Sequence, residues 1–225
     1  MIKLEDLLNQ EPKQEILEMD DLVPLVNGDM DFIHEEPIIE IPDYIINDPE
    51  IVGYPDEQFQ NDIYQGALGW YYIDTIADVG CGRGDFYQKI DDYDDPKYTG
   101  FELNDVLIRA GKIKYPEINI KNENFLDYDG DNFDRIFFIG SLNQDYGFYD
   151  TTTFWGKYDY FKKVLFHSLK HCNKSLIFIL LQDAENDFIA HPISEVTSIL
   201  TKENLPFHID YSKFNGIYRL EVFNP

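Results

Sequence analysis

The chain has 225 residues, of which 44% are hydrophobic and 16% aromatic, and this composition excludes global disorder. Its formal net charge of −25 disfavours contact with a phosphate backbone or an anionic membrane surface, so neither nucleic acid nor membrane is expected as a partner. The sequence shows no apolar run long enough to span a bilayer, and its two cysteines are too few for a disulfide framework; a reducing, cytoplasmic location is therefore expected.

Residues 1–50 are predicted to form an acidic, partly ordered N-terminal arm that precedes a main domain at residues 51–225. Residues 1–60 contain 17 Asp and Glu but only two Lys, and prolines interrupt the whole segment. The arm has too few apolar residues for a core of its own. It is either a solvated or packed-down extension or a segment that binds a protein partner.

From residue 73 onward, short apolar runs alternate with segments of helical length. Strands are predicted at 73–79, 98–103, 118–121, 135–139, 175–181, 207–211 and 218–223, and helices at 85–90, 105–115 and 157–171. This alternation predicts an α/β fold with a mainly parallel sheet and helices on both faces. The last two strands flank the turn signal Asn215-Gly216 and predict a C-terminal antiparallel hairpin.

The first strand runs into three alternating glycines, Gly80, Gly82 and Gly84. Glycine permits a tight turn there and lets the backbone approach a ligand closely. Glu102 ends the second strand, about 20 residues further on, where an acid can accept both hydrogen bonds of a ribose diol. Alternatively, Glu102 serves the start of the helix predicted from Asp105. Arg83 is expected to be a solvated or salt-bridged residue of the loop, not a phosphate ligand.

The segment from Asp78 to Gly84 resembles the first motif, D-x-G-x-G-x-G, of class I S-adenosylmethionine-dependent methyltransferases, and the spacing to Glu102 is similar to that of their second motif. The resemblance implies a Rossmann-like, seven-stranded sheet with S-adenosylmethionine as cofactor. The cofactor-binding residues that it implies are Asp78, Gly80, Cys81, Gly82 and Gly84 for the methionyl moiety, Glu102 for the ribose, Asn124 and Phe125 for the adenine, and also Leu103 and Gly140.

The loop after the third strand departs from the family at one position, since an Asp commonly stands where this chain has Asn124. An Asn can still accept a hydrogen bond from the adenine amino group through its carbonyl oxygen. Phe125 is expected to flank the base and to offer its main-chain N–H to a ring nitrogen.

A narrower resemblance, to small phage and bacterial methyltransferases of unassigned substrate, rests on Val52-Gly53-Tyr54 with Gln60 and on the sequence from Gly140 to Asn143. In the class I fold, the transferred methyl group is expected to point to the residues just beyond the fourth strand, and Ser141 and Asn143 there are the predicted catalytic residues. Asn143 either orients a nucleophile or caps a helix.

Two further groups of residues near the fourth strand leave alternatives open. Asp145 and Tyr146 either contact an amine or hydroxyl acceptor or belong to a plain loop. The aromatic residues that follow either line a pocket or belong to the core. They are Phe148, Tyr149, Phe154, Trp155, Tyr158, Tyr160 and Phe161.

No metal site is predicted. Asp127, Asp129 and Asp131 lack the Gly and Glu positions of an EF-hand loop, and His167 and His171 lack the pattern of a zinc protease. The predicted function is methyl transfer to a small-molecule or protein acceptor. One alternative is a catalytically silent methyltransferase-like fold that serves a larger assembly through its acidic arm, and another is a different use of a nucleoside cofactor, such as hydrolysis.

Overall fold

The computed structural model describes residues 40–69, 75–90, 97–143, 154–183, 188–211 and 216–225. All of them belong to one compact unit, Glu40–Pro225. Residues 1–39, which make up most of the predicted arm, lie outside the described residues, so the interpretation of the arm stays a prediction.

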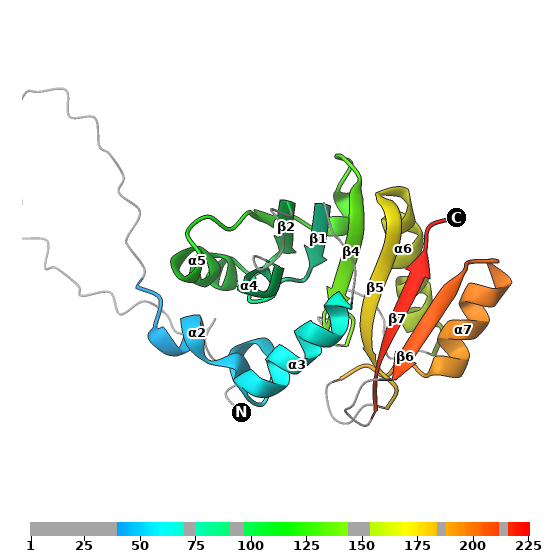
Figure 1. Cartoon of the computed structure of the whole chain (residues 1–225), viewed down its shortest axis with the longest axis horizontal. Helices are drawn as coiled ribbons and strands as arrows, with labels where there is room; N and C mark the ends of the chain where they lie inside the picture. Colours follow the sequence, from blue (N-terminus) through cyan, green and yellow to red (C-terminus); the bar gives the residue numbers. More distant parts are fainter. Residues whose placement is uncertain (1–39, 70–74, 91–96, 144–153, 184–187, 212–215) are drawn as a thin grey trace, which may run out of the picture. The chain divides into compact units, whose positions relative to one another are not determined.

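The strands of the described residues form one seven-stranded sheet in the order β3-β2-β1-β4-β5-β7-β6 (Figure 1). The first five strands are parallel, whereas β7 is antiparallel to both of its neighbours, β5 and β6. The chain builds outward from β1 to β3 and then returns to place β4 beside β1. In such sheets, ligands bind where the strand order reverses, outside the carboxyl ends of the strands. The bounds are β1 (Thr75–Val79), β2 (Lys97–Glu102), β3 (Ile120–Asn122), β4 (Phe133–Ile139), β5 (Cys172–Leu181), β6 (Phe207–Tyr211) and β7 (Ile217–Phe223).

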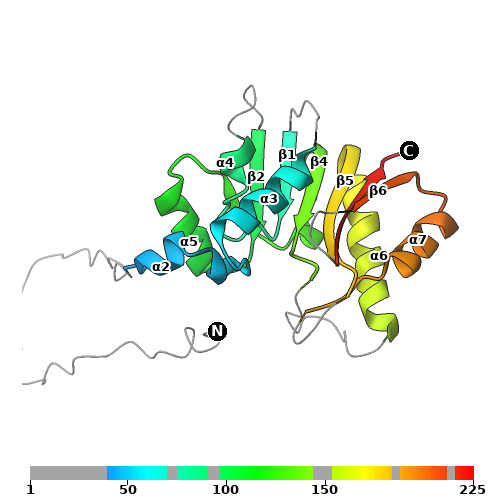
Figure 2. The same ribbon diagram turned by 60° about the horizontal axis from the view of Figure 1, so that its bottom comes forward.

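Helices cover both faces of this sheet (Figure 2). On one face, α3, α4 and α5 pack against buried strand residues such as Ile76 and Phe137. On the other face, α6 and α7 pack against residues such as Ala77 and Phe178. The predicted α/β fold, with its mainly parallel sheet and C-terminal antiparallel pair, is confirmed. The bounds are α3 (Glu57–Leu68), α4 (Tyr87–Ile90), α5 (Asp105–Lys114), α6 (Phe154–Lys170) and α7 (Ile193–Lys202).

Two short helices precede α3, and they belong to the same compact unit as the sheet. They are α2 (Asp43–Asn47) and the 3-10 helix η1 (Pro49–Val52). Ile41 and Ile45 pack with Ala110 of α5 in a small apolar cluster. The sequence alone assigns residues 40–50 to the acidic arm, because a few isoleucines among acidic residues show no helical or strand periodicity.

The helix predicted at 85–90 is shorter than expected. Residues 82–86 form turns, and α4 begins only at Tyr87. The reason is local, because the N–H groups of Gly84 and Tyr87 bond to carbonyl oxygens three residues earlier, at 2.8 and 2.9 Å. The chain therefore turns more tightly here than in an α-helix.

Candidate functional site

The glycine turn lies directly after β1, beside the point where the strand order reverses. Gly80, Gly82 and Gly84 have φ values of 71°, 57° and 76°, conformations that are open to glycine at little cost. The carbonyl oxygen of Phe101 in β2 accepts the N–H groups of Gly80 and Cys81 at 2.8 and 3.1 Å. These two hydrogen bonds fix the turn to the end of β2.

Neighbouring residues approach the turn so closely that side chains on it would collide with them. A Cβ on Gly80 would lie 2.4 Å from the Cβ of Ser141, and one on Gly82 would lie 3.1 Å from Cγ1 of Val52. On the α5 side, a Cβ on Gly111 would lie 2.4 Å from the carbonyl oxygen of Arg83. The loop after β4, η1 and α5 therefore enclose the turn, while Gly80 itself is exposed.

Glu102 lies at the carboxyl end of β2, next to the turn. Its Oε2 accepts the Gly82 N–H at 2.9 Å, and its Oε1 accepts the N–H groups of Leu103 and Asn104 at 2.7 and 2.9 Å. Asn104, not Glu102, caps α5, because its side chain accepts the N–H groups of Val106 and Leu107. Glu102 accepts the N–H of Asn104, the cap residue itself, so it also serves the start of this helix, as the alternative expects. Three donors use three of about four lone-pair sites on the carboxylate.

Asp78 lies within β1 and is buried, and its Oδ2 accepts a hydrogen bond from the Tyr98 hydroxyl at 2.8 Å. Burial raises the pKa of Asp78 to about 7, although the Tyr98 hydrogen bond opposes the rise; the nearby Glu102 adds to it. Burial also raises the pKa of the Cys81 thiol. Cys81 is therefore a neutral thiol packed in the turn and not a nucleophile.

Stability should fall with rising pH because of Asp78. The unfolded carboxyl ionises near its ordinary pKa of about 3.9, but the buried carboxyl keeps its proton up to about pH 7, so the contribution is complete below pH 4 and lost by about pH 7. Asp78→Asn should remove this loss, a difference on the order of 1 kcal/mol per pH unit between pH 5 and 7. Urea unfolding of both proteins at pH 5, 6, 7 and 8 measures it. Parallel pH dependences for the two proteins would contradict the prediction.

The loop after β3 presents Asn124 and the 3-10 helix η2 (Phe125–Asp127). The Asn124 side chain accepts the Leu126 N–H at 3.1 Å and so caps η2, and its oxygen retains a second lone pair. The ring of Phe125 is only 3% exposed and packs edge to face on Phe101, with ring centroids 5.0 Å apart. The expectation that this ring flanks a base is thus wrong, because the core buries it. Leu103 is 50% exposed and offers an apolar surface instead.

The loop after β4 brings Gly140, Ser141 and Asn143 to the same edge of the sheet. Gly140 has a φ of 81°, and its Cα lies near the Tyr54 hydroxyl, which a Cβ there would approach to 3.8 Å. The Oγ of Ser141 is buried and has no hydrogen-bond partner among the described residues. A buried hydroxyl of this kind is ready to bond to a ligand.

Asn143 is buried, and both ends of its amide bond to the main chain of β5. It donates to the carbonyl oxygen of Ile179 at 3.1 Å and accepts the Leu181 N–H at 3.3 Å. Its main chain adds two more hydrogen bonds, from its N–H to Gly140 and from the Ile189 N–H to its carbonyl oxygen. These contacts tie the loop to β5 and cap no helix. They use one donor and one acceptor site of the amide, and the catalytic role of Asn143 stays a prediction.

Several other predicted residues can be placed only in part. Asp145, Tyr146, Phe148 and Tyr149 lie outside the described residues, as do the side chains of Phe154 and Trp155. Tyr158 and Phe161 of α6 are buried, which supports the core alternative for these two residues. His167 of α6 and His171, directly after this helix, neighbour each other with ring centroids 4.9 Å apart, and both contact Phe125. Across the described residues, no three His, Cys, Asp or Glu side chains gather to hold a metal ion.

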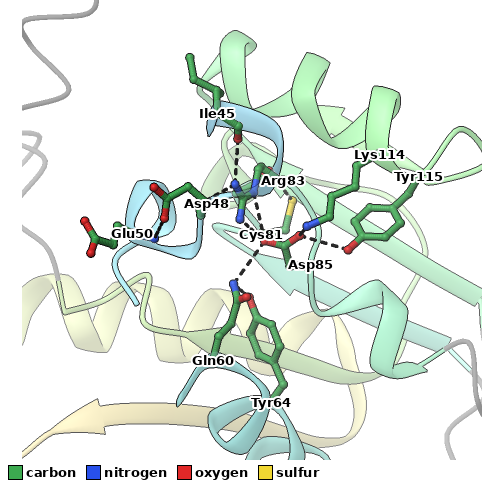
Figure 3. A network of polar contacts seen from close by, with 11 residues as sticks. Ile45, Asp48, Glu50, Gln60, Tyr64, Cys81, Arg83, Asp85, Lys114 and Tyr115 are labelled. Carbon is green, nitrogen blue, oxygen red and sulfur yellow. Dashed lines mark hydrogen bonds and ion pairs between the residues drawn. The ribbon is translucent and has the colours of Figure 1, made fainter. Parts of the chain in front are cut away.

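Arg83 is fully buried, so the solvated alternative is wrong and the salt-bridged one is confirmed. Its Nη2 lies 2.7 Å from Oδ2 of Asp85, at the centre of the polar network in Figure 3. Lys114 and Tyr115 from the end of α5 and Gln60 from α3 complete this network around Asp85. Of these residues, only Gln60 and Arg83 stand out in the sequence, because the others belong to no motif.

No protein-family model matches the chain, and no curated protein is similar to it in sequence. Solved methyltransferase structures share its fold. The N-methyltransferase NodS from Bradyrhizobium japonicum, in complex with S-adenosyl-l-homocysteine, is 16% identical over 80% of this chain and 94% of its own, with a TM-score of 0.60.

Two further solved structures are similar over most of their length. Magnesium protoporphyrin IX methyltransferase from Synechocystis, with bound SAM, is 13% identical over 74% of this chain and 77% of its own, with a TM-score of 0.51. CalS10, an amino pentose methyltransferase from Micromonospora echinaspora, is 11% identical over 73% of this chain and 88% of its own, with a TM-score of 0.52. At these identities the likeness establishes the fold, which is the Rossmann-like fold expected from the sequence. Within the described residues, no helix is both long and apolar enough to cross a bilayer.

Proposed function

We propose that this protein is an S-adenosylmethionine-dependent methyltransferase that acts on a small-molecule or protein acceptor. The observation that carries the proposal is the position of Glu102, a carboxylate at the carboxyl end of β2 that directly contacts the glycine turn after β1. Ligands of parallel α/β sheets bind at this reversal of strand order, and an acid there suits a ribose diol. The fold shared with methyltransferases supports the proposal.

The described residues fit this cofactor in three ways. The turn from Gly80 to Gly84, with Cys81 and Gly82 between them, exposes the main chain of Gly80, so a ligand can reach the backbone there. Asp78 places a carboxyl group beneath the turn, and an ammonium group bound there would favour its ionised form. The buried, unpartnered Oγ of Ser141 faces the same turn from the loop after β4.

The proposed roles follow from these positions. Glu102 accepts a ribose hydroxyl at its remaining lone-pair site, with the apolar surface of Leu103 beside it. Asp78 and the glycine turn hold the methionyl end. Asn124 and the main chain of Phe125 bind the adenine edge, while Gly140 and Ser141 border the methyl group. S-adenosylmethionine supplies an activated methyl group, and the protein contributes binding, orientation and exclusion of water.

This chemistry does not require a general base from the chain when the acceptor is already nucleophilic, because proximity and alignment alone contribute several kcal/mol. Asn143 is engaged with β5, so the described residues favour an acceptor that needs little activation. The net charge of −25 further favours a neutral or cationic acceptor over a polyanion.

Titration calorimetry of S-adenosylmethionine and S-adenosylhomocysteine into the purified full chain tests the proposal. We expect micromolar binding of both, with a stoichiometry of about one per chain. Turnover of S-adenosylmethionine against pools of small amines, hydroxyl compounds and basic proteins then identifies the acceptor class. A folded protein that binds neither nucleoside would contradict the proposal and favour the structural-module alternative.

A further inference from the structure

The buried network around Arg83 connects the glycine turn with the short helices that precede α3. Arg83 donates from Nε and Nη2 to Oδ2 of Asp85, at 3.1 and 2.7 Å. Its Nη1 donates to the carbonyl oxygens of Ile45 and Asp48, both at 2.8 Å. Figure 3 shows the guanidinium between these partners. A fully buried guanidinium needs such partners, because leaving its donors unpaired is costly.

The two carbonyl groups that Arg83 binds lie at the end of α2. Carbonyl groups at a helix C-terminus have no partner within the helix, and a cation there also suits the helix dipole. Arg83 therefore closes α2 from outside, across 35 to 38 residues of sequence. The rest of this segment, residues 40–52, is held by Ile41 and Ile45 against Ala110 and by Val52 against Gly82.

Asp85 holds the other side of Arg83 in place. Its Oδ1 accepts from Nζ of Lys114 at 2.8 Å and from the Tyr115 hydroxyl at 3.1 Å, and its Oδ2 accepts from Gln60 at 3.2 Å. Burial acts to raise the pKa of Asp85, but Arg83 and Lys114 outweigh this effect and hold the pKa below its ordinary value. The pair is thus ionised and anchored to α3 and α5.

The residue next to Arg83 makes the contact with Glu102. Gly82 donates its N–H to Oε2 of Glu102 at 2.9 Å, and a Cβ on it would lie 3.1 Å from Val52. One glycine therefore touches both the carboxylate proposed for the ribose and the segment 40–52. A displacement of that segment would move Arg83 and Gly82, and with them the donor that sets the position of Glu102.

We infer that Arg83 is a positioning residue that couples the docking of residues 40–52 to binding of the cofactor. The inference rests on the proposed function. The docked segment holds the turn and Glu102 in the binding geometry. By thermodynamic linkage, a bound cofactor stabilises the docked segment by the same factor.

The test compares the full chain with Arg83→Met, with Ile45→Asp, which puts a charge into the apolar contact of α2, and with the double variant. Calorimetry with S-adenosylhomocysteine should show affinity about tenfold weaker in each single variant. The double variant should be no weaker than either single one, because both substitutions break the same connection. Tyr44→Asp, at the exposed neighbour of Ile45, and Arg109→Met, at an exposed arginine of α5, are matched controls and should bind normally.

Hydrogen exchange supplies the readout that a purely structural role would not change. In the wild type, S-adenosylhomocysteine should slow exchange of the Asp48, Gly53 and Tyr54 amides, which bond within α2 and η1. In Arg83→Met saturated with S-adenosylhomocysteine, exchange of these three amides should not become slower. Wild-type affinity in a folded Arg83→Met, or equal protection in both proteins, would overturn the coupling. If Arg83→Met does not fold, Arg83→Lys and Ile45→Asp decide by the same criteria. A wild type that binds no ligand would instead refute the proposed function.

Discussion

Glu102→Ala is expected to weaken binding of S-adenosylmethionine and S-adenosylhomocysteine by at least about a hundredfold. A hydrogen bond from a ribose hydroxyl to a charged carboxylate contributes about 1.5–3 kcal/mol, and a hundredfold weaker affinity corresponds to about 2.7 kcal/mol. Three main-chain N–H groups also lose their acceptor, which loosens the connection between β2 and the glycine turn. Calorimetry measures the affinity directly.

Glu117→Ala is the matched control for this substitution. Glu117 is exposed and precedes β3, at the opposite end of the sheet from Glu102, so its loss should leave binding unchanged. Glu102→Gln keeps the size of the side chain and one acceptor oxygen, and it should bind at least about tenfold more weakly than the wild type. Wild-type affinity in a folded Glu102→Ala protein would remove Glu102 from the site.

Gly80→Ala is expected to lower the free energy of unfolding by about 2–4 kcal/mol. The positive φ of 71° costs an alanine about 1 kcal/mol, and the collision of its Cβ with the Cβ of Ser141, at 2.4 Å, adds about 1–3 kcal/mol. The Cβ of Ser141 is fixed to the backbone and cannot rotate away. Urea unfolding of the wild type and the variant measures the difference.

Two further variants separate the causes of this loss. Gly216→Ala has a φ of 81° but open space around its Cβ, so it should lose only about 1 kcal/mol. Adding Ser141→Gly to Gly80→Ala removes the colliding atom and should restore the steric part of the loss. Equal stability of Gly80→Ala and Gly216→Ala would show that the loop after β4 does not pack on the turn.

The sequence alone determined the α/β class, the mainly parallel sheet and the position of the glycine turn along the chain. Apolar runs such as those of β4 and β5 belong to strands covered on both faces, and alternation with helices makes such strands parallel. The glycine turn and Glu102 are also local features. A positive φ requires glycine, and a fixed spacing brings the second strand end beside the first. Both are therefore recognisable from residue types and their spacing along the chain.

Only the tertiary structure decided which side chains are free to meet a ligand. Phe125 and Asn143 stand at positions that suit a binding role, yet the core buries the ring of one and β5 binds the amide of the other. Arg83 is the clearest case. Two of its partners are main-chain carbonyl groups 35 and 38 residues away, and a carbonyl group is present at every residue. Such a contact leaves no trace in the residue types, so the connection between the first helices and the glycine turn emerges only when the chain is folded.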